Sequence, residues 1–186
     1  MVPELLTPRL RLRALQADDA PALLEVLGDE QVTRYHSMPT LSSLAEASDA
    51  LAGVDQRFQA GEMIRWAIQP RTDRRLIGTV GLLHVVAEHR RGELGYELAR
   101  RWWGRGLMPE AAAVVIGYGF TVLGLHRIEA GVLVGNDPSV RVLQKLGFQE
   151  EGTLRHYLYL KGRFHDVRWF GLLANANPPV DHHTEL

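Results

Sequence analysis

The order of strand-like and helix-like segments constrains the fold of this chain more than any other feature of its sequence. Alternating apolar and charged residues predict a first strand over 10–13, and two capped helices follow over about 19–27 and 43–58. The remaining expected segments are three strands, a long helix, a strand, a helix and two strands, over about 64–69, 76–86, 92–98, 107–123, 127–134, 137–147, 148–158 and 164–172. Because strands and helices interleave, we expect a mixed α/β fold with a largely central sheet.

The length of 186 residues fits one domain, which we place at 1–174, with 175–186 as a C-terminal tail. A chain of this size can bury roughly 70% of its unfolded surface, so the core needs no cross-links. The sequence contains no cysteine, which excludes disulfides, thiolate metal sites and Cys nucleophiles. The adjacent pair His182 and His183 lies on the expected tail and makes a poor metal site, so we expect no metal.

The charge balance points away from nucleic acid and membranes. The formal net charge is −1, and charged residues make up 23% of the chain, close to the globular average of about 25%. No apolar run approaches the ~20 residues that span a bilayer. The first residues also lack the basic and apolar regions of a signal peptide. We therefore expect a soluble cytoplasmic protein with no nucleic-acid or membrane partner.

The basic residues are almost all arginine, and the only lysines are Lys145 and Lys161. Codon bias explains such a preference, and so does anion binding, because the guanidinium group holds phosphates in a bidentate fork. Five arginines lie close together in the sequence: Arg90, Arg91, Arg100, Arg101 and Arg105.

The segment Arg101-Trp102-Trp103-Gly104-Arg105-Gly106 stands between an expected strand and the long helix. Two glycines let the backbone approach a ligand, and the following helix start offers unpaired N–H groups with a partial positive charge. Together these features predict a pyrophosphate cradle. A dinucleotide fingerprint is excluded because Pro109 stands where the third glycine belongs, and no Walker loop is present. A plain strand-to-helix turn remains the alternative.

About thirty residues further on, Asn136-Asp137-Pro138-Ser139 closes a strand and opens a capped helix. Lys145-Leu146-Gly147-Phe148 then ends that helix and starts the next strand. Taken alone, this segment is a good helix boundary and nothing more.

Together the two segments resemble the GNAT superfamily of N-acetyltransferases, and their surroundings are similar to its RimJ/RimL branch. The likeness covers most of the chain. Further matching segments are 7–13, 66–68, 76–81, 93–98, 110–111, 151–155 and 162–167. The resemblance implies a mixed central sheet of about seven strands, splayed in the middle and flanked by about four helices.

The resemblance also implies an acetyl-CoA site in the V-shaped split of that sheet. Arg101 matches the first position of the family's Arg/Gln-x-x-Gly-x-Gly motif. Backbone groups of Leu98 would pair with the pantetheine arm, and Asn136 and Ser139 would face that arm and the sulfur. The pyrophosphate would meet the backbone of Trp103, Gly104, Arg105, Gly106 and Leu107.

Acetyl transfer to an amine needs a base for the amine proton and an acid for the leaving thiolate. Glu93 is the expected base, because several GNAT enzymes carry a glutamate on this strand. Alternation places Glu97 on the same face as a second candidate. The competing interpretation of Glu93 is an edge carboxylate paired with an arginine. Glu110 and Glu151 match the family pattern as structural residues.

Many GNAT enzymes use a tyrosine of the last helix as the acid, but Leu143 occupies that place here. The resemblance to the RimJ/RimL branch makes Ser139 the substitute, although Ser139 could also only hydrogen-bond the thiol. Tyr157 and Tyr159 are weaker candidates.

The expected function is direct transfer of an acetyl group from acetyl-CoA to a primary amine, since no cysteine is available for a covalent intermediate. The RimJ/RimL likeness suggests a protein N-terminal α-amine; a small-molecule amine and a non-catalytic CoA-binding regulatory module are the alternatives. A homodimer is left open as the assembly. Five side chains lie on segments that line the acceptor cleft in this family, although each alone is more typical of core or surface: Tyr35, His36, Trp66, His84 and His156.

Overall fold

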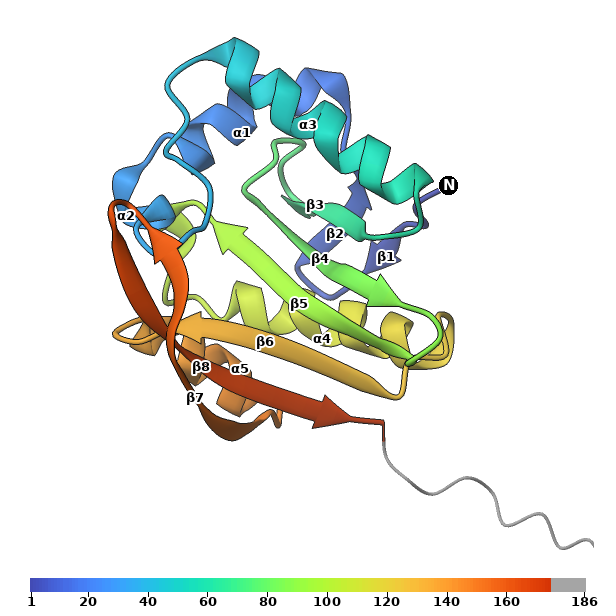
Figure 1. Ribbon diagram of the computed structural model, residues 1–186. Helices are drawn as coiled ribbons and strands as arrows, with labels where there is room; N and C mark the ends of the chain where they lie inside the picture. Colours follow the sequence, from blue (N-terminus) through green and yellow to red (C-terminus); the bar gives the residue numbers. More distant parts are fainter. Residues whose placement is uncertain (175–186) are drawn as a thin grey trace, which may run out of the picture.

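The computed structural model describes residues 1–174, and these form one eight-stranded sheet with helices on both faces (Figure 1). The strand order across the sheet is β1-β2-β3-β4-β5-β6-β8-β7, and all neighbours are antiparallel except β5 and β6. The strands are β1 (Leu5–Leu6), β2 (Leu10–Ala14), β3 (Ile64–Pro70), β4 (Gly78–Val86), β5 (Arg91–Leu98), β6 (Arg127–Leu133), β7 (Gln149–Leu160) and β8 (Arg163–Leu173).

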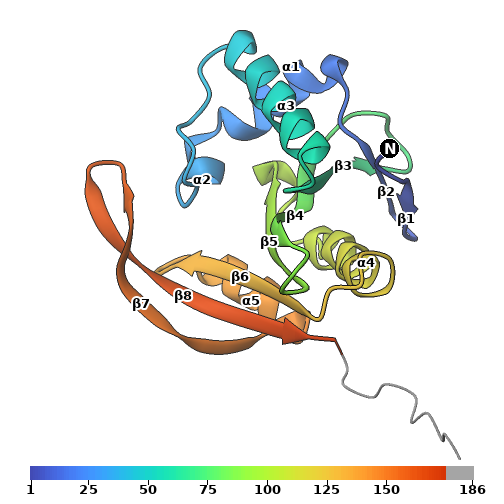
Figure 2. The ribbon, with the colours of Figure 1, turned by 45° about the vertical axis from the view of Figure 1, so that its right-hand side comes forward.

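The helices divide between the two faces of the sheet. The α-helices are α1 (Ala20–Leu27), α2 (Glu30–Thr33), α3 (Leu44–Gln59), α4 (Leu107–Thr121) and α5 (Asp137–Lys145). Buried residues of α1 and α3 pack with Ala67 of β3, whereas those of α4 and α5 pack with Trp66, Val80 and Leu94. We call these the α1/α3 face and the α4/α5 face; Figure 2 shows α3 and α4 on opposite sides of β4 and β5.

The mixed α/β class and the splayed sheet are confirmed, and the differences lie in the shortest elements. The sheet has eight strands rather than about seven, because β1 contributes two residues, and there are five α-helices rather than about four, because α2 contributes four. Elements this short carry no periodicity for a sequence to reveal. The long helix also ends at Thr121, two residues before the expected end. The expected tail over 175–186, with His182 and His183, lies outside the described residues.

The parallel pair β5 and β6 stays together for only three residues. Arg91, Gly92 and Glu93 pair with Arg127, Ile128 and Glu129, and beyond them no pairing joins the two strands. Figure 2 shows β5 and β6 meeting at one end and diverging toward the other. We call the opening between residues 94–98 and residues 130–133 the fork. Because β5 and β6 run parallel, its wide end lies at the carboxyl ends of both strands.

Alternation along β5 decides which side chains flank the fork on each face. Leu94, Tyr96 and Leu98 belong to the cluster packed with α4 and α5. Glu93 and Glu97 have the opposite parity, so they lie on the α1/α3 face. The two faces of one short strand therefore carry different chemistry. Within residues 1–174 no helix is long and apolar enough to cross a membrane.

Candidate active site

Along the fork, the backbone N–H groups of β5 have no neighbouring strand and are free to bind a ligand. Trp103 Nε1 donates to the Leu98 carbonyl oxygen (2.6 Å), whereas the next amide, that of Ala99, donates to Ile77 on the β4 side (2.8 Å). Since the N–H and C=O groups of a strand residue point to the same side and alternate along the chain, the amides of Leu98 and Tyr96 face the fork. Leu98, whose backbone we expected to pair with the pantetheine arm, therefore has its amide directed into the fork.

The glycine-bearing loop stands at the wide end of the fork. Gly104 and Gly106 have φ values of +72° and +71°, a region that residues with a Cβ rarely adopt. No other atom lies within 4 Å of a Cβ at Gly104, and at Gly106 only Arg9 Nη2 does, at 3.7 Å. Gly106 is also the N-cap of α4, so the first amides of that helix, including that of Leu107, are without helical partners. The loop is thus an open backbone surface rich in donors.

Arg9 holds this loop in place, a role that the sequence did not reveal. Its guanidinium donates to the carbonyl oxygens of Arg105 (2.9 Å) and Gly106 (3.2 Å), and its Nε donates to Glu110 (2.6 Å). Glu110 also accepts from the Thr7 hydroxyl (2.5 Å). Burial alone would raise the pKa of Glu110, but these hydrogen bonds outweigh it and lower that pKa. Glu110 is a structural residue, as expected.

The arginine run does not form one site. Arg90 and Arg91 stand at the closed end of the fork, while Arg100, Arg101 and Arg105 follow its wide end, roughly 25 Å away along an extended strand. Arg100 pairs with Asp29 (2.9 Å), and Arg101 lies 3.9 Å from Glu25. Arg105 lies over the Trp102 ring, 4.9 Å from its centroid. Of the five arginines in this run, the three at the wide end are the ones next to the glycine loop in sequence.

Ser139 and Asn136 lie across the fork from β5. Asn136 is the N-cap of α5, and its Oδ1 accepts a long hydrogen bond from the Ser139 amide (3.4 Å). The Ser139 hydroxyl lies 2.8 Å from the hydroxyl of Tyr96. This contact joins the two limbs of the fork on the α4/α5 face. Leu143, at the position of the family's tyrosine, is fully buried in the core.

Tyr96 is a further candidate that the sequence reading missed. Its burial raises the pKa to about 12, and the hydrogen bond with Ser139 only partly offsets that effect. The phenol therefore keeps its proton at neutral pH. The available signal was its parity with Leu94 and Leu98, which places it on the face that meets α5. In contrast, Tyr157 and Tyr159 are exposed on β7.

The carboxylates of the α1/α3 face differ sharply from each other. Glu97 is 7% exposed, and its two carboxylate oxygens accept from Arg65 and from the Thr79 hydroxyl. Glu93 forms no hydrogen bond with an arginine. Its Oε2 lies 2.9 Å from His84 Nδ1. Glu93 stands at the point where β5 and β6 separate. Glu151 is held by Arg127, which lowers the pKa of its carboxyl, as suits a structural residue.

Of the five expected acceptor-cleft residues, the structure brings two to the wide end of the fork. Trp66 belongs to the core: it is fully buried, and its Nε1 donates to Pro3 (2.7 Å). His84 is 74% exposed, and His156 stacks on Phe164 of the β7–β8 hairpin. Tyr35 donates its hydroxyl hydrogen to the Gly135 carbonyl (2.9 Å), beside Asn136. Burial lowers the pKa of His36, with smaller effects from the nearby charges of Glu97, Arg65 and Lys161.

Comparisons with known proteins agree with this geometry. Residues 9–149 match the acetyltransferase (GNAT) domain. The uncharacterized N-acetyltransferase YoaA of Bacillus subtilis is 38% identical over 173 residues, which cover 93% of this chain and 98% of that protein.

Two solved structures are also similar. RimJ of Mycobacterium smegmatis, in complex with CoA-disulfide, has a TM-score of 0.81 at 26% identity and covers 89% of this chain and 82% of that one. Spermidine N-acetyltransferase of Vibrio cholerae, in complex with CoA and spermine, has a TM-score of 0.78 at 26% identity and covers 90% and 96%.

The chain belongs to the GNAT acetyltransferase family. It is an N-acetyltransferase whose acetyl donor is acetyl-CoA, and its acceptor is an amine.

The raised pKa of Tyr96 predicts a specific loss of stability in alkali. The unfolded phenol ionises near pH 10 and the folded one near pH 12, so stability present below pH 10 falls as the pH rises toward 12. The difference corresponds to at most roughly 3 kcal/mol. In urea unfolding between about pH 9 and 12, Tyr96→Phe should lose stability less steeply than the native protein. The exposed Tyr157→Phe is the control, and equal slopes for Tyr96→Phe and the native protein would contradict the assignment.

Proposed function

We propose that this protein acetylates the α-amine at the N-terminus of a peptide or protein, with acetyl-CoA bound in the fork. The observation that carries the proposal is the combination of an unpaired β5 backbone with an open, donor-rich glycine loop at its carboxyl end. The similarity to RimJ supports the RimJ/RimL branch, and the resemblance to that branch implies a protein acceptor. The similarity to a spermidine N-acetyltransferase makes a small amine the second candidate.

The residues of the fork fit acetyl-CoA. A pyrophosphate suits the Gly104–Gly106 loop, because the first amides of α4 are donors without helical partners and the space beside both glycines is open. In this proposal the holding groups are the backbone from Trp103 to Leu107, with Arg101 and Arg105 as nearby cations. The backbone of Leu98 and the Asn136 side chain hold the pantetheine arm.

The bound thioester supplies an activated acetyl group and a thiolate leaving group. On the α4/α5 face, Ser139 is the hydroxyl nearest the start of α5, and Tyr96 keeps it oriented through a 2.8 Å contact. Since Tyr96 stays protonated at neutral pH, it can donate a hydrogen bond to Ser139 while the Ser139 hydroxyl donates to the leaving sulfur. The partial positive charge of the α5 N-terminus adds to this stabilisation.

The amine is bound on the α1/α3 face in this proposal. An α-amine, with a pKa of about 8, is partly neutral at pH 7, whereas a lysine amine at about 10.4 is almost wholly charged. Glu93 is the proposed base, because it stands at the apex of the fork and has no cationic partner that is permanently charged. Glu97 is not used, because Arg65 and Thr79 hold its carboxylate.

Two further expectations remain predictions. These are the cytoplasmic location and the homodimer.

A mass-spectrometric screen tests the function. The protein is incubated with acetyl-CoA and one amine at a time: a peptide with a free N-terminus, the same peptide with a blocked N-terminus but a free lysine, a polyamine and an aminoglycoside. We expect the mass gain of one acetyl group on the first peptide and none on the blocked one. Acetylation of the polyamine alone would overturn the peptide proposal. Binding of acetyl-CoA without transfer to any amine would favour a regulatory module.

The glycine loop predicts how acetyl-CoA stabilises the fold. At about 100 times its dissociation constant, a ligand of the folded state adds about 2.7 kcal/mol, which raises Tm by several degrees. Gly106→Val should abolish this shift, because a β-branched residue is strained at φ +71°. The control is Gly124→Val, which introduces similar strain (φ +63°) beyond the opposite end of α4. A full shift in Gly106→Val would refute the cradle.

Glu93→Gln should reduce turnover far more than acetyl-CoA affinity. Loss of a general base typically costs ~10²–10⁴-fold, and the loss should shrink at high pH, where the amine is already neutral. The control is Glu88→Gln, an exposed carboxylate in the β4–β5 turn. Steady-state kinetics between about pH 7 and 9.5 measure both. A Glu93→Gln rate within twofold of the native rate at pH 7 would remove Glu93 from the mechanism.

A further inference from the structure

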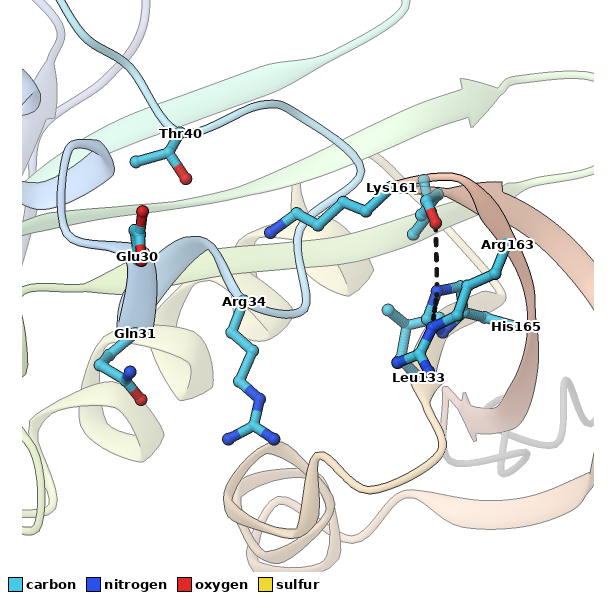
Figure 3. A pocket seen from close by; sticks show the side chains of 9 residues that line it. Glu30, Gln31, Arg34, Thr40, Leu133, Lys161, Arg163 and His165 are labelled. Carbon is cyan, nitrogen blue, oxygen red and sulfur yellow. Dashed lines mark hydrogen bonds between the residues drawn. The ribbon is translucent and has the colours of Figure 1, made fainter.

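A cavity lies between α2 and the tip of the β7–β8 hairpin, at the wide end of the fork (Figures 1 and 3). Its volume is about 530 Å³, within the usual range for ligand pockets. Leu133, the last residue of β6, forms part of its wall. The side chains that line it are those of Glu30, Gln31, Arg34, Thr40, Leu133, Leu160, Lys161, Arg163 and His165.

Three cations line this cavity against one carboxylate. Arg34, Lys161 and Arg163 line it together with Glu30, and Figure 3 shows these side chains around the opening. None of the three cations belongs to an ion pair within residues 1–174, although ten of the other arginines do. The cavity therefore gathers two arginines and a lysine whose charges have no ion-pair partner in the described part of the chain.

These cations are held in position without being neutralised. Lys161 Nζ donates to the Thr33 carbonyl (3.1 Å), and Lys161 lies in a turn with Gly162 where both φ values are positive. The Arg34 guanidinium lies over the Tyr35 ring, 5.3 Å from its centroid, and Tyr35 is fixed to Gly135. Arg163 uses only its Nε, toward His165 (3.3 Å). The Nη atoms of both arginines have no hydrogen-bond partner in the described part of the chain.

The cavity adjoins the α1/α3 face of the fork. The Thr33 carbonyl accepts hydrogen bonds from both Lys161 Nζ (3.1 Å) and the His36 amide (3.0 Å), so the hairpin tip lies beside the segment that follows α2. The Tyr35–Gly135 contact brings the α2 segment to the loop that carries Asn136. An amine bound at the fork would therefore have the rest of its molecule in or beside this cavity.

We propose that the cavity binds an oxyanion of the acceptor, so that the preferred substrate is an amine that carries a carboxylate a short distance away. This inference rests on the proposed function. Guanidinium groups with free Nη atoms bind carboxylates in a bidentate manner, and an ammonium adds a third donor. The carboxylate comes either from an acidic side chain near a peptide N-terminus or from a free amino acid. A polyamine is disfavoured, because its charges would face three cations.

The test compares acceptors that differ only in charge. Two peptides are used that are identical except for Glu or Gln at the second position, together with free glutamate and spermidine. We expect kcat/KM for the Glu peptide to exceed that for the Gln peptide by about tenfold, mainly through KM, because a hydrogen bond to a charged group contributes about 1.5 kcal/mol or more. The preference should shrink at high salt. Preference for free glutamate over both peptides would assign the cavity to an amino acid.

Variants of the chain connect that preference to the cavity. In Arg34→Gln/Arg163→Gln the ratio of the two kcat/KM values should fall to about one, whereas Arg57→Gln, an exposed arginine of α3, should keep it. Titration calorimetry with the N-acetylated Glu peptide, which cannot react, should show the same loss of binding in the double variant. Equal use of both peptides, or a preference that survives the double variant, would overturn the inference. Failure to acetylate any amine would instead overturn the proposed function.

Discussion

The rest of this structure depends on the early separation of two parallel strands. Three residue pairs join β5 to β6, and after Glu93 and Glu129 each strand keeps only its outer neighbour. A buried strand edge without partners is costly, because backbone N–H and C=O groups must find hydrogen bonds. Here part of that need is met by Trp103, which donates to Leu98, and the rest is open to a ligand with an amide-bearing chain. The pantetheine arm of coenzyme A has that chemistry.

The separation also divides the chemistry between two faces of one strand. A strand exposes alternate side chains to opposite sides, so Tyr96 meets Ser139 among α4 and α5, while Glu93 and Glu97 stand on the side of α1 and α3. Glu97 is held by Arg65 and Thr79, which also hydrogen-bond each other. Glu93, four residues earlier on the same strand, has no arginine or threonine partner. Two glutamates on the same face of one strand thus differ because their neighbouring side chains differ.

Most of the fold could be predicted from the sequence, because long helices and strands show a clear hydrophobic periodicity and helix ends carry capping residues. The Asn136 cap, the turn at Lys161 and Gly162, and the glycine loop before α4 are local signals, and each was found at its expected place. Contacts between distant segments could not be predicted. Arg9 reaches the loop at Arg105 and Gly106 across about a hundred residues of sequence. Tyr96 and Ser139 meet only because the sheet splays, and the arginine run separates because a strand of fixed length lies within it.

The opposed placement of Glu93 and Ser139 bears on the order in which molecules enter and leave. With the proposed assignments, donor and acceptor approach the reacting atoms from opposite sides of the sheet, so neither blocks the other's route. A compulsory order of addition then has no steric basis, and a ternary complex can assemble from either side. In this proposal Glu93 takes the proton from the amine, and a different group, Ser139, donates to the sulfur. Each turnover would leave one face protonated and the other deprotonated until water restores both.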